Sequence, residues 1–192
     1  MAGEIARIAY LFLPLIAGLI FHGFCIRFGW LLSLAKPIDR GATLRGRPLF
    51  GANKTWRGVV AVALGSGLVL FLQGGWLHGH PGFRGLELTD YAALPAGLLG
   101  CVLGAAAMLS ELPNSLVKRQ LGIAPGRPGS GLWEFLFYVA DQIDMLVGAW
   151  LVLALAVPVT FTRIALSAVL FVVVHQVLSW AGYALGMRRS AR

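Results

Sequence analysis

Charged side chains are scarce in this sequence. Asp, Glu, Lys and Arg make up 12% of its 192 residues, while 58% are hydrophobic; soluble domains usually carry about 25% charged residues. So little polar surface excludes an ordinary soluble domain, because the chain needs lipid as part of its solvent. The length suits one integral membrane domain and leaves no room for a separate soluble one, so we expect a single domain over residues 1–192.

Cysteine is nearly absent as well. The only two, Cys25 and Cys101, lie in apolar runs, and neither has a partner at the spacing of a disulfide framework or a metal site. We therefore interpret both as small buried hydrophobic residues. The first apolar run is not followed by a small-residue cleavage site, which favours a first membrane span over a cleaved signal peptide.

Long apolar runs are what the sequence has instead. A membrane-spanning helix needs about 20 mostly apolar residues. Five windows meet this requirement, at residues 5–26, 58–77, 91–109, 139–157 and 162–186. The sequence therefore predicts an all-α integral membrane protein with about five transmembrane helices and two structured loops on one side.

Basic residues gather on one side of this five-span layout. The loop after the first span, the loop after the third and the C-terminal tail share a side and hold thirteen Lys and Arg, against three on the other. Cytoplasmic loops of membrane proteins carry such an excess, so we expect a multi-pass protein of the cell membrane with its N-terminus outside. This topology and an anionic substrate explain the net charge of +8 without nucleic acid.

The loop over residues 36–58 has the residue types of a phosphate-binding loop. It is rich in glycine and proline, which predicts a structured loop and not a helix. It is not a Walker A motif, because Lys54 comes two residues too late after Gly46 and Gly51. Its Lys54, Thr55 and Arg57 nevertheless offer charge and donors for phosphate at the start of a helix. The alternative is that these basic residues only anchor the chain at the membrane surface.

Two carboxylates lie inside the fourth apolar segment. Asp141 and Asp144 are three residues apart, so they share a helix face, and ionisable groups at such a depth are expensive and rarely face lipid. Two like charges on one face need a cation between them, or one must stay protonated. Mg²⁺ suits such a pair. Glu134 either joins it or caps the start of the helix.

A third acid, Glu111, follows the third apolar window on the same side. It is either a further metal ligand or the ion-pair partner of Lys118 or Arg119. Acids that hold a metal, beside basic groups that neutralise phosphates, point to phosphoryl or nucleotidyl transfer onto a lipid. An alternative of another class is a small transporter that uses the aspartate pair to relay protons or cations.

Three motifs on this side of the membrane stand in a fixed order. They are P-I-D-x-G…G-R-x-x-x-G-x-x-K-T-W-R-G, S-x-x-K-R-x-L-G-I and D-Q-x-D, at residues 37–58, 115–123 and 141–144. In this order they resemble the motifs of the CDP-archaeol synthase family, archaeal membrane relatives of the CDP-diacylglycerol synthases. The five-span layout extends the resemblance to nearly the whole chain.

The resemblance implies Mg²⁺-dependent transfer of a cytidylyl group from CTP to a lipid phosphate, with release of pyrophosphate. In the archaeal family the acceptor is digeranylgeranylglyceryl phosphate, whereas phosphatidic acid is the alternative acceptor. The resemblance implies a metal held by Asp141, Asp144 and Glu111, with a second cation left open, and a catalytic Lys118 beside these acids. The residues implied to contact CTP or its phosphates are Asp39, Gly51, Lys54, Thr55, Arg57, Lys118 and Arg119.

The sequence also departs from the family pattern. Ala52 stands where the family usually has an aspartate, and Glu111 stands where it has a shorter acid. The connection over residues 125–138 is longer than in the archaeal family. The sequence leaves open whether the protein acts alone or as a homodimer in the membrane.

Overall fold

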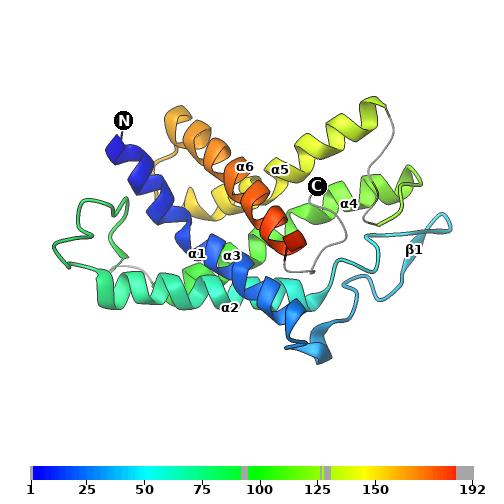
Figure 1. Cartoon of the computed structure of the whole chain (residues 1–192), viewed down its shortest axis with the longest axis horizontal. Coiled ribbons are helices and arrows are strands. Elements are labelled where there is room, and N and C mark those ends of the chain that lie inside the picture. The colour runs from blue at the N-terminus through cyan, green and yellow to red at the C-terminus, as the bar shows by residue number, and fades with distance from the viewer. Residues whose placement is uncertain (1, 92–94, 126, 128–130, 185–192) are drawn as a thin grey trace.

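Five long helical segments of the described chain run back and forth through the molecule (Figure 1). The structure is a computed structural model and describes residues 2–91, 95–125, 127 and 131–184. Each segment is long and apolar enough to cross a membrane, which confirms the expected all-α membrane architecture. The helices are α1 (Ala2–Arg27), α2 (Trp56–Leu72) with the π-helical turn η2 (Gln73–Leu77), α3 (Ala96–Leu109) continued by α4 (Glu111–Gln120), α5 (Leu132–Leu153) and α6 (Phe161–Ala184).

Two of the expected windows differ from the helices at their ends. The third segment starts at Ala96 and continues through α4 to Gln120, beyond the apolar window. The fourth starts at Leu132 and not at residue 139, because its first turns are aromatic, as expected of a helix that begins at the membrane interface. Asp141 and Asp144 therefore lie near the middle of α5. The basic C-terminal residues 188–192 lie outside the described residues.

Glycines bring α1, α2 and α3 into close contact. A Cβ on Gly18 would lie 2.6 Å from the Val62 carbonyl oxygen, and one on Gly100 would lie 2.5 Å from that of Ser66. Gly65 and Gly67 of α2 are packed equally closely, because added Cβ atoms would lie 2.7 Å from the Gly18 Cα and 2.4 Å from the Cys101 Sγ. Small residues let helix backbones approach where lipid provides no hydrophobic drive for association.

A close glycine contact also joins α3 to α5 and so positions the polar residues that follow. A Cβ on Gly148 would lie 2.5 Å from the Ala106 carbonyl oxygen and 2.4 Å from the Ser110 Oγ. This contact lies just before the start of α4, at Glu111. The main core, which includes Phe12, Leu15, Val62, Leu103 and Ala149, is shared by these helices. As a result, α4 and the middle of α5 lie side by side.

The loop between α1 and α2 is structured, as expected, and contains a small hairpin. Strands β1 (Thr43–Leu44) and β2 (Arg47–Pro48) pair antiparallel. Between them Arg45 and Gly46 have φ of 53° and 75°, the left-handed geometry that a two-residue type I′ turn requires. Pro37 also pairs with Thr55, which closes the base of the loop. This loop and the C-terminal end of α4 lie at the same end of the molecule (Figure 1).

The glycine contacts give a testable prediction. Gly100→Ala places a methyl group against the backbone of α2, and overpacking of this kind usually costs about 1–3 kcal/mol. We expect it to lower the apparent unfolding temperature in detergent. Gly23→Ala is the matched control, because an added Cβ on this α1 glycine meets nothing within 4 Å. Equal unfolding temperatures for the two variants would contradict the packing described here.

Candidate active site

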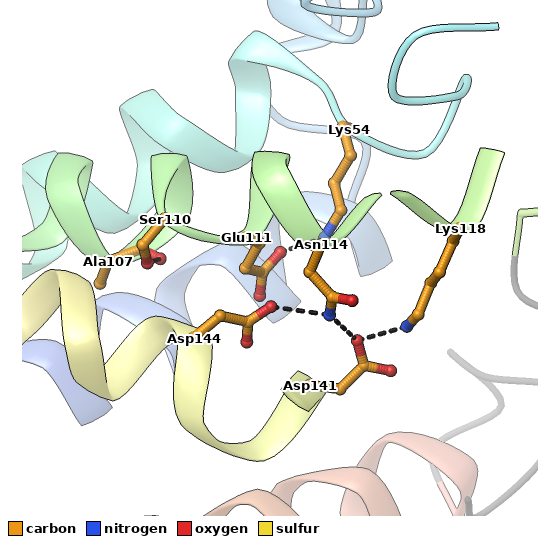
Figure 2. A network of polar contacts seen from close by, with 8 residues as sticks. All are labelled: Lys54, Ala107, Ser110, Glu111, Asn114, Lys118, Asp141 and Asp144. Carbon is orange, nitrogen blue, oxygen red and sulfur yellow. Dashed lines mark hydrogen bonds and ion pairs between the residues drawn. The ribbon is translucent and has the colours of Figure 1, made fainter. Parts of the chain in front are cut away.

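One amide side chain connects the two aspartates of α5. The Asn114 Nδ2 donates hydrogen bonds to the Asp141 Oδ1 at 2.7 Å and to the Asp144 Oδ2 at 2.9 Å. Asn114 lies on α4, about one turn after Glu111 and one turn before Lys118, so the three side chains share a helix face. Figure 2 shows that this face of α4 points at the two aspartates.

Two lysines accompany the acids. Lys54, from the loop before α2, forms an ion pair with Glu111, and Lys118 forms an ion pair with Asp141. The Lys118 ammonium also lies 5.3 Å from the centre of the Phe137 ring, a favourable cation–π distance. The six polar side chains thus converge from the first loop, α4 and α5 (Figure 2).

These ion pairs correct one interpretation of the sequence and add a partner for the aspartates. Glu111 pairs with Lys54 and not with Lys118 or Arg119, because Lys118 turns toward α5 instead. The aspartate pair has no basic residue in its own helix, yet Asp141 finds Lys118 on the neighbouring one. Glu134 is exposed in the first turn of α5.

Asp144 keeps one oxygen unused. Its Oδ1 is buried and has no hydrogen-bond partner within the described part of the chain. Its other oxygen is bound only by the neutral Asn114. A buried carboxylate without a compensating cation is costly, so this oxygen is a position where a bound cation would be stabilised.

Asp39 organises the first loop from within. Its Oδ2 accepts hydrogen bonds from the backbone N–H groups of Phe50 (2.9 Å) and Gly51 (3.1 Å), and its Oδ1 accepts one from Gly41 (2.9 Å). Partial burial works to raise the pKa of Asp39, but these N–H groups outweigh it and hold the pKa below its usual value. In the described structure its carboxylate oxygens are therefore used within the loop, which indicates a positioning role.

Gly51 lets the first loop touch the second. Its φ is 97°, a conformation that side chains rarely adopt. A Cβ there would lie 2.9 Å from the Pro125 Cγ and 3.6 Å from the Arg119 Cδ. The hairpin is fastened to the same region, because the Arg47 guanidinium donates to the Gln120 carbonyl oxygen. An open cavity of about 560 Å³ lies here, lined by Leu44, Arg45, Arg47 and Gln120.

Two arginines have buried donors without a hydrogen-bond partner among the described residues, and Arg119 lies beside this contact. Arg119 is only 6% exposed, yet its Nε and Nη1 are buried without a hydrogen-bond partner among the residues that the structure describes. The same holds for the Nε of Arg57. Thr55, just before the first residue of α2, makes no side-chain capping hydrogen bond. The arginine donors and the helix N-terminus together suit an anion.

Asn114 is the site residue that the sequence motifs missed. An amide gives no charge signal, and the second motif begins only at residue 115. Its spacing from Glu111 and Lys118 was the available signal, because residues three and four apart share a helix face. Ala52, at the position of the family's aspartate, is exposed in the loop.

A profile of the CarS-like family, described as CDP-archaeol synthase, matches residues 8–191. The chain belongs to this family. Its enzyme class is that of a CTP-dependent lipid-phosphate cytidylyltransferase, which confirms the resemblance seen in the three motifs and replaces the transporter alternative.

Individual relatives agree with this assignment. The chain is 34% identical over 159 residues to a CDP-archaeol synthase of Halobacterium salinarum, covering 80% of this chain and 81% of the relative. It is 28% identical over 171 residues to a CDP-archaeol synthase of Methanococcoides burtonii, covering 84% and 93%. A solved structure, "Structural insight into an intramembrane enzyme for archaeal membrane lipids biosynthesis", matches with a TM-score of 0.58 at 24% identity, over 88% of this chain and 90% of that chain. The similarity to this solved structure supports the fold described above.

The role of Asp39 gives the second prediction. Asp39→Asn replaces one acceptor oxygen by an N–H donor, so the loop loses part of its internal bonding and becomes easier to cleave. We expect faster tryptic cleavage after Arg40 and Arg45 in detergent at pH 8, whereas the Arg47–Pro48 bond resists trypsin in any case. Asp90→Asn, in the loop before α3, should leave the rate unchanged.

The pH dependence has a definite sign. Because the pKa of Asp39 is depressed in the folded protein, its stabilisation is complete above the carboxyl's ordinary value of about 3.9 and is lost as the pH falls through the folded value. In the wild type, amide exchange at Phe50 and Gly51 should therefore stay slower than in Asp39→Asn at pH 6. Only below pH 4 should the wild-type exchange rate rise toward that of Asp39→Asn.

Proposed function

We propose that the protein transfers a cytidylyl group from CTP to digeranylgeranylglyceryl phosphate in the cell membrane and releases pyrophosphate. The relatives named above support an archaeol-type acceptor. The observation that carries the proposal is the junction of α4, α5 and the first loop, where three acids meet two lysines. Arginine side chains add buried donors that have no hydrogen-bond partner among the described residues. Acids for a metal and cations for phosphates are the components of nucleotidyl transfer.

The residues present fit Mg²⁺. Among the described residues no three His, Cys, Asp or Glu side chains gather closely enough to hold a metal by themselves, but Mg²⁺ is usually held by one or two carboxylates plus substrate phosphates. Asp141 and Asp144 supply the two carboxylates, and the buried unpartnered Oδ1 of Asp144 is a free ligand position. Glu111 would join them if Lys54 moved to the substrate phosphates. When bound, Mg²⁺ would neutralise phosphate charge and polarise the reacting phosphoryl group.

The chain's own residues then position the substrates. The lipid phosphate oxygen attacks the α-phosphorus of CTP, the bond to the bridging oxygen breaks, and pyrophosphate leaves with that oxygen. Lys54, Thr55 and Arg57 bind the nucleotide phosphates at the start of α2, and Arg119 binds the triphosphate or the lipid phosphate. Lys118 moves from Asp141 to the charge that develops on the phosphates. No covalent intermediate with the protein is required.

The lipid approaches from within the membrane. Asp144 lies in a spanning helix, whereas Lys54 lies in the loop outside it, so the site stands at the membrane boundary. We place this boundary on the cytoplasmic side, with the N-terminus outside, because the basic residues concentrate in these loops. CTP then enters from the cytoplasm, and the tails of the acceptor stay in lipid.

The aspartates provide the direct test. We expect purified protein with labelled CTP and Mg²⁺ to convert digeranylgeranylglyceryl phosphate to its CDP derivative. Asp141→Asn and Asp144→Asn should reduce kcat roughly 100-fold or more, since loss of even a supporting partner of a metal ligand costs 10–100-fold. Asp90→Asn, at the other end of the molecule, is the control.

The same assay identifies the preferred lipid acceptor. Phosphatidic acid runs beside the archaeal lipid, and a higher kcat/KM for phosphatidic acid would contradict the proposed acceptor. If neither lipid is cytidylylated while the protein remains folded, the proposed activity of this chain fails.

Arg119 gives a separate prediction. Arg119→Met removes the Nε and Nη1 donors, which have no hydrogen-bond partner among the described residues, so we expect folding to be unaffected. A hydrogen bond to a charged group is worth about 1.5–3 kcal/mol, and we expect a roughly ten- to hundred-fold rise in KM for CTP or for the lipid phosphate. Arg127→Met, in the loop that follows α4 and exposed, should leave both KM values unchanged. Unchanged kinetics in Arg119→Met would remove this residue from substrate binding.

A further inference from the structure

We propose that His175 is a positioning residue for the active site and acts through Gln142 on the aspartates of α5. This inference rests on the proposed function, because it assigns to α6 a role in that reaction. The observation behind it is a hydrogen bond between the Gln142 Nε2 and the His175 Nδ1, 3.1 Å long. Gln142 lies between Asp141 and Asp144 in the sequence, but its side chain points to the opposite neighbour, α6.

The part of α5 that carries the aspartates has little apolar packing. In residues 132–144, all of which the structure describes, only Phe137 and Gln142 are buried. Large side chains such as Trp133, Phe135 and Tyr138 are about half exposed. Hydrophobic burial therefore fixes the rotation of this half-helix weakly, in contrast to the half from Met145 to Leu153.

Polar contacts hold this half-helix from two sides. On one side Asn114 and Lys118 of α4 bind the aspartates themselves. On the other side α6 supplies His175 to Gln142, and Gln176 donates to the Tyr138 hydroxyl at 2.6 Å. Gln142 is 5% exposed, so its contact with His175 is shielded from solvent. If Gln142 is released, this half of α5 loses a buried contact with α6, and even a small change in its rotation moves both aspartates relative to Asn114.

The α5–α6 contact repeats at the far end, which provides an internal control. The Trp150 Nε1 donates to the Ser167 Oγ at 2.9 Å. This bond lies eight residues along from the first on both helices, from 142 to 150 on α5 and from 175 to 167 on α6. Leu146 and Phe171, halfway between, are both buried in the main core. The two hydrogen bonds join the same pair of helices, but only the first lies beside the acids.

The test compares loss of each bond in the cytidylyl-transfer assay. His175→Leu should lower kcat roughly ten-fold, because small displacements of catalytic groups cost one to two orders of magnitude. His175→Asn keeps a hydrogen-bonding group near the position of Nδ1 and should restore kcat to within about three-fold of the wild type. Ser167→Ala leaves the Trp150 N–H unpaired at the other end and should lower thermal stability without this loss of kcat.

A double variant tests whether His175 acts through Gln142. If it does, Gln142→Leu/His175→Leu should be no slower than Gln142→Leu alone, because both changes break one connection. The inference would be overturned if the kcat losses of the two single variants multiplied in the double variant. It would also be overturned if Ser167→Ala lost as much kcat as His175→Leu, or if His175→Asn did not restore kcat.

The failure of this inference is distinguishable from failure of the proposed function. An inactive wild type would refute the function, and the inference would then be judged by Mn²⁺ binding to the purified protein with CTP, followed by electron paramagnetic resonance. Weaker Mn²⁺ binding in His175→Leu than in Ser167→Ala would support the positioning role. Equal binding in the two variants, or no binding to the wild type, would overturn it.

Discussion

The carboxylate of Asp144, placed inside a membrane-spanning helix, is the constraint on which the site depends. An acid at this position needs polar partners, and its own helix offers none with positive charge. The partners come from elsewhere in the chain: Asn114 binds it directly, Lys118 holds the neighbouring Asp141, and Lys54 holds Glu111. Close packing of α3 on α5 at Gly148 makes this meeting possible.

The site also has a marked electrostatic asymmetry. Glu111 and Asp141 are paired with lysines and Asp144 is not, whereas the Nε and Nη1 of Arg119 and the Nε of Arg57 are buried without a hydrogen-bond partner in the described part of the chain. One part of the site therefore keeps an unmatched carboxylate, and the part that holds Arg119, next to Gly51, keeps positive charge. A nucleoside triphosphate that arrives with a divalent cation would complete both parts, since its phosphates satisfy the arginines while its cation meets the carboxylates.

Local patterns in the sequence were sufficient for the architecture. The five spans follow from apolar length, the first loop from its glycines and prolines, and the shared face of Asp141 and Asp144 from their spacing. Pairings between distant segments were not accessible in this way. Lys54 and Glu111 are 57 residues apart, and an ammonium group fits any of the three acids equally well by charge alone. The packing of the helices decides which acid each lysine reaches. Asn114 is distinguished from an ordinary polar residue only by its contacts with both aspartates in the folded structure.

The order of the helices along the chain matters for how α5 reaches its place. Asn114 and Lys118 precede Asp141 and Asp144 in the sequence, so they are synthesised before the acidic helix is. The donor and the cation on α4 are therefore available before α5 and its carboxylates are made. The acids of α5 thus give this helix a polar partner that precedes it along the chain, in addition to its apolar packing.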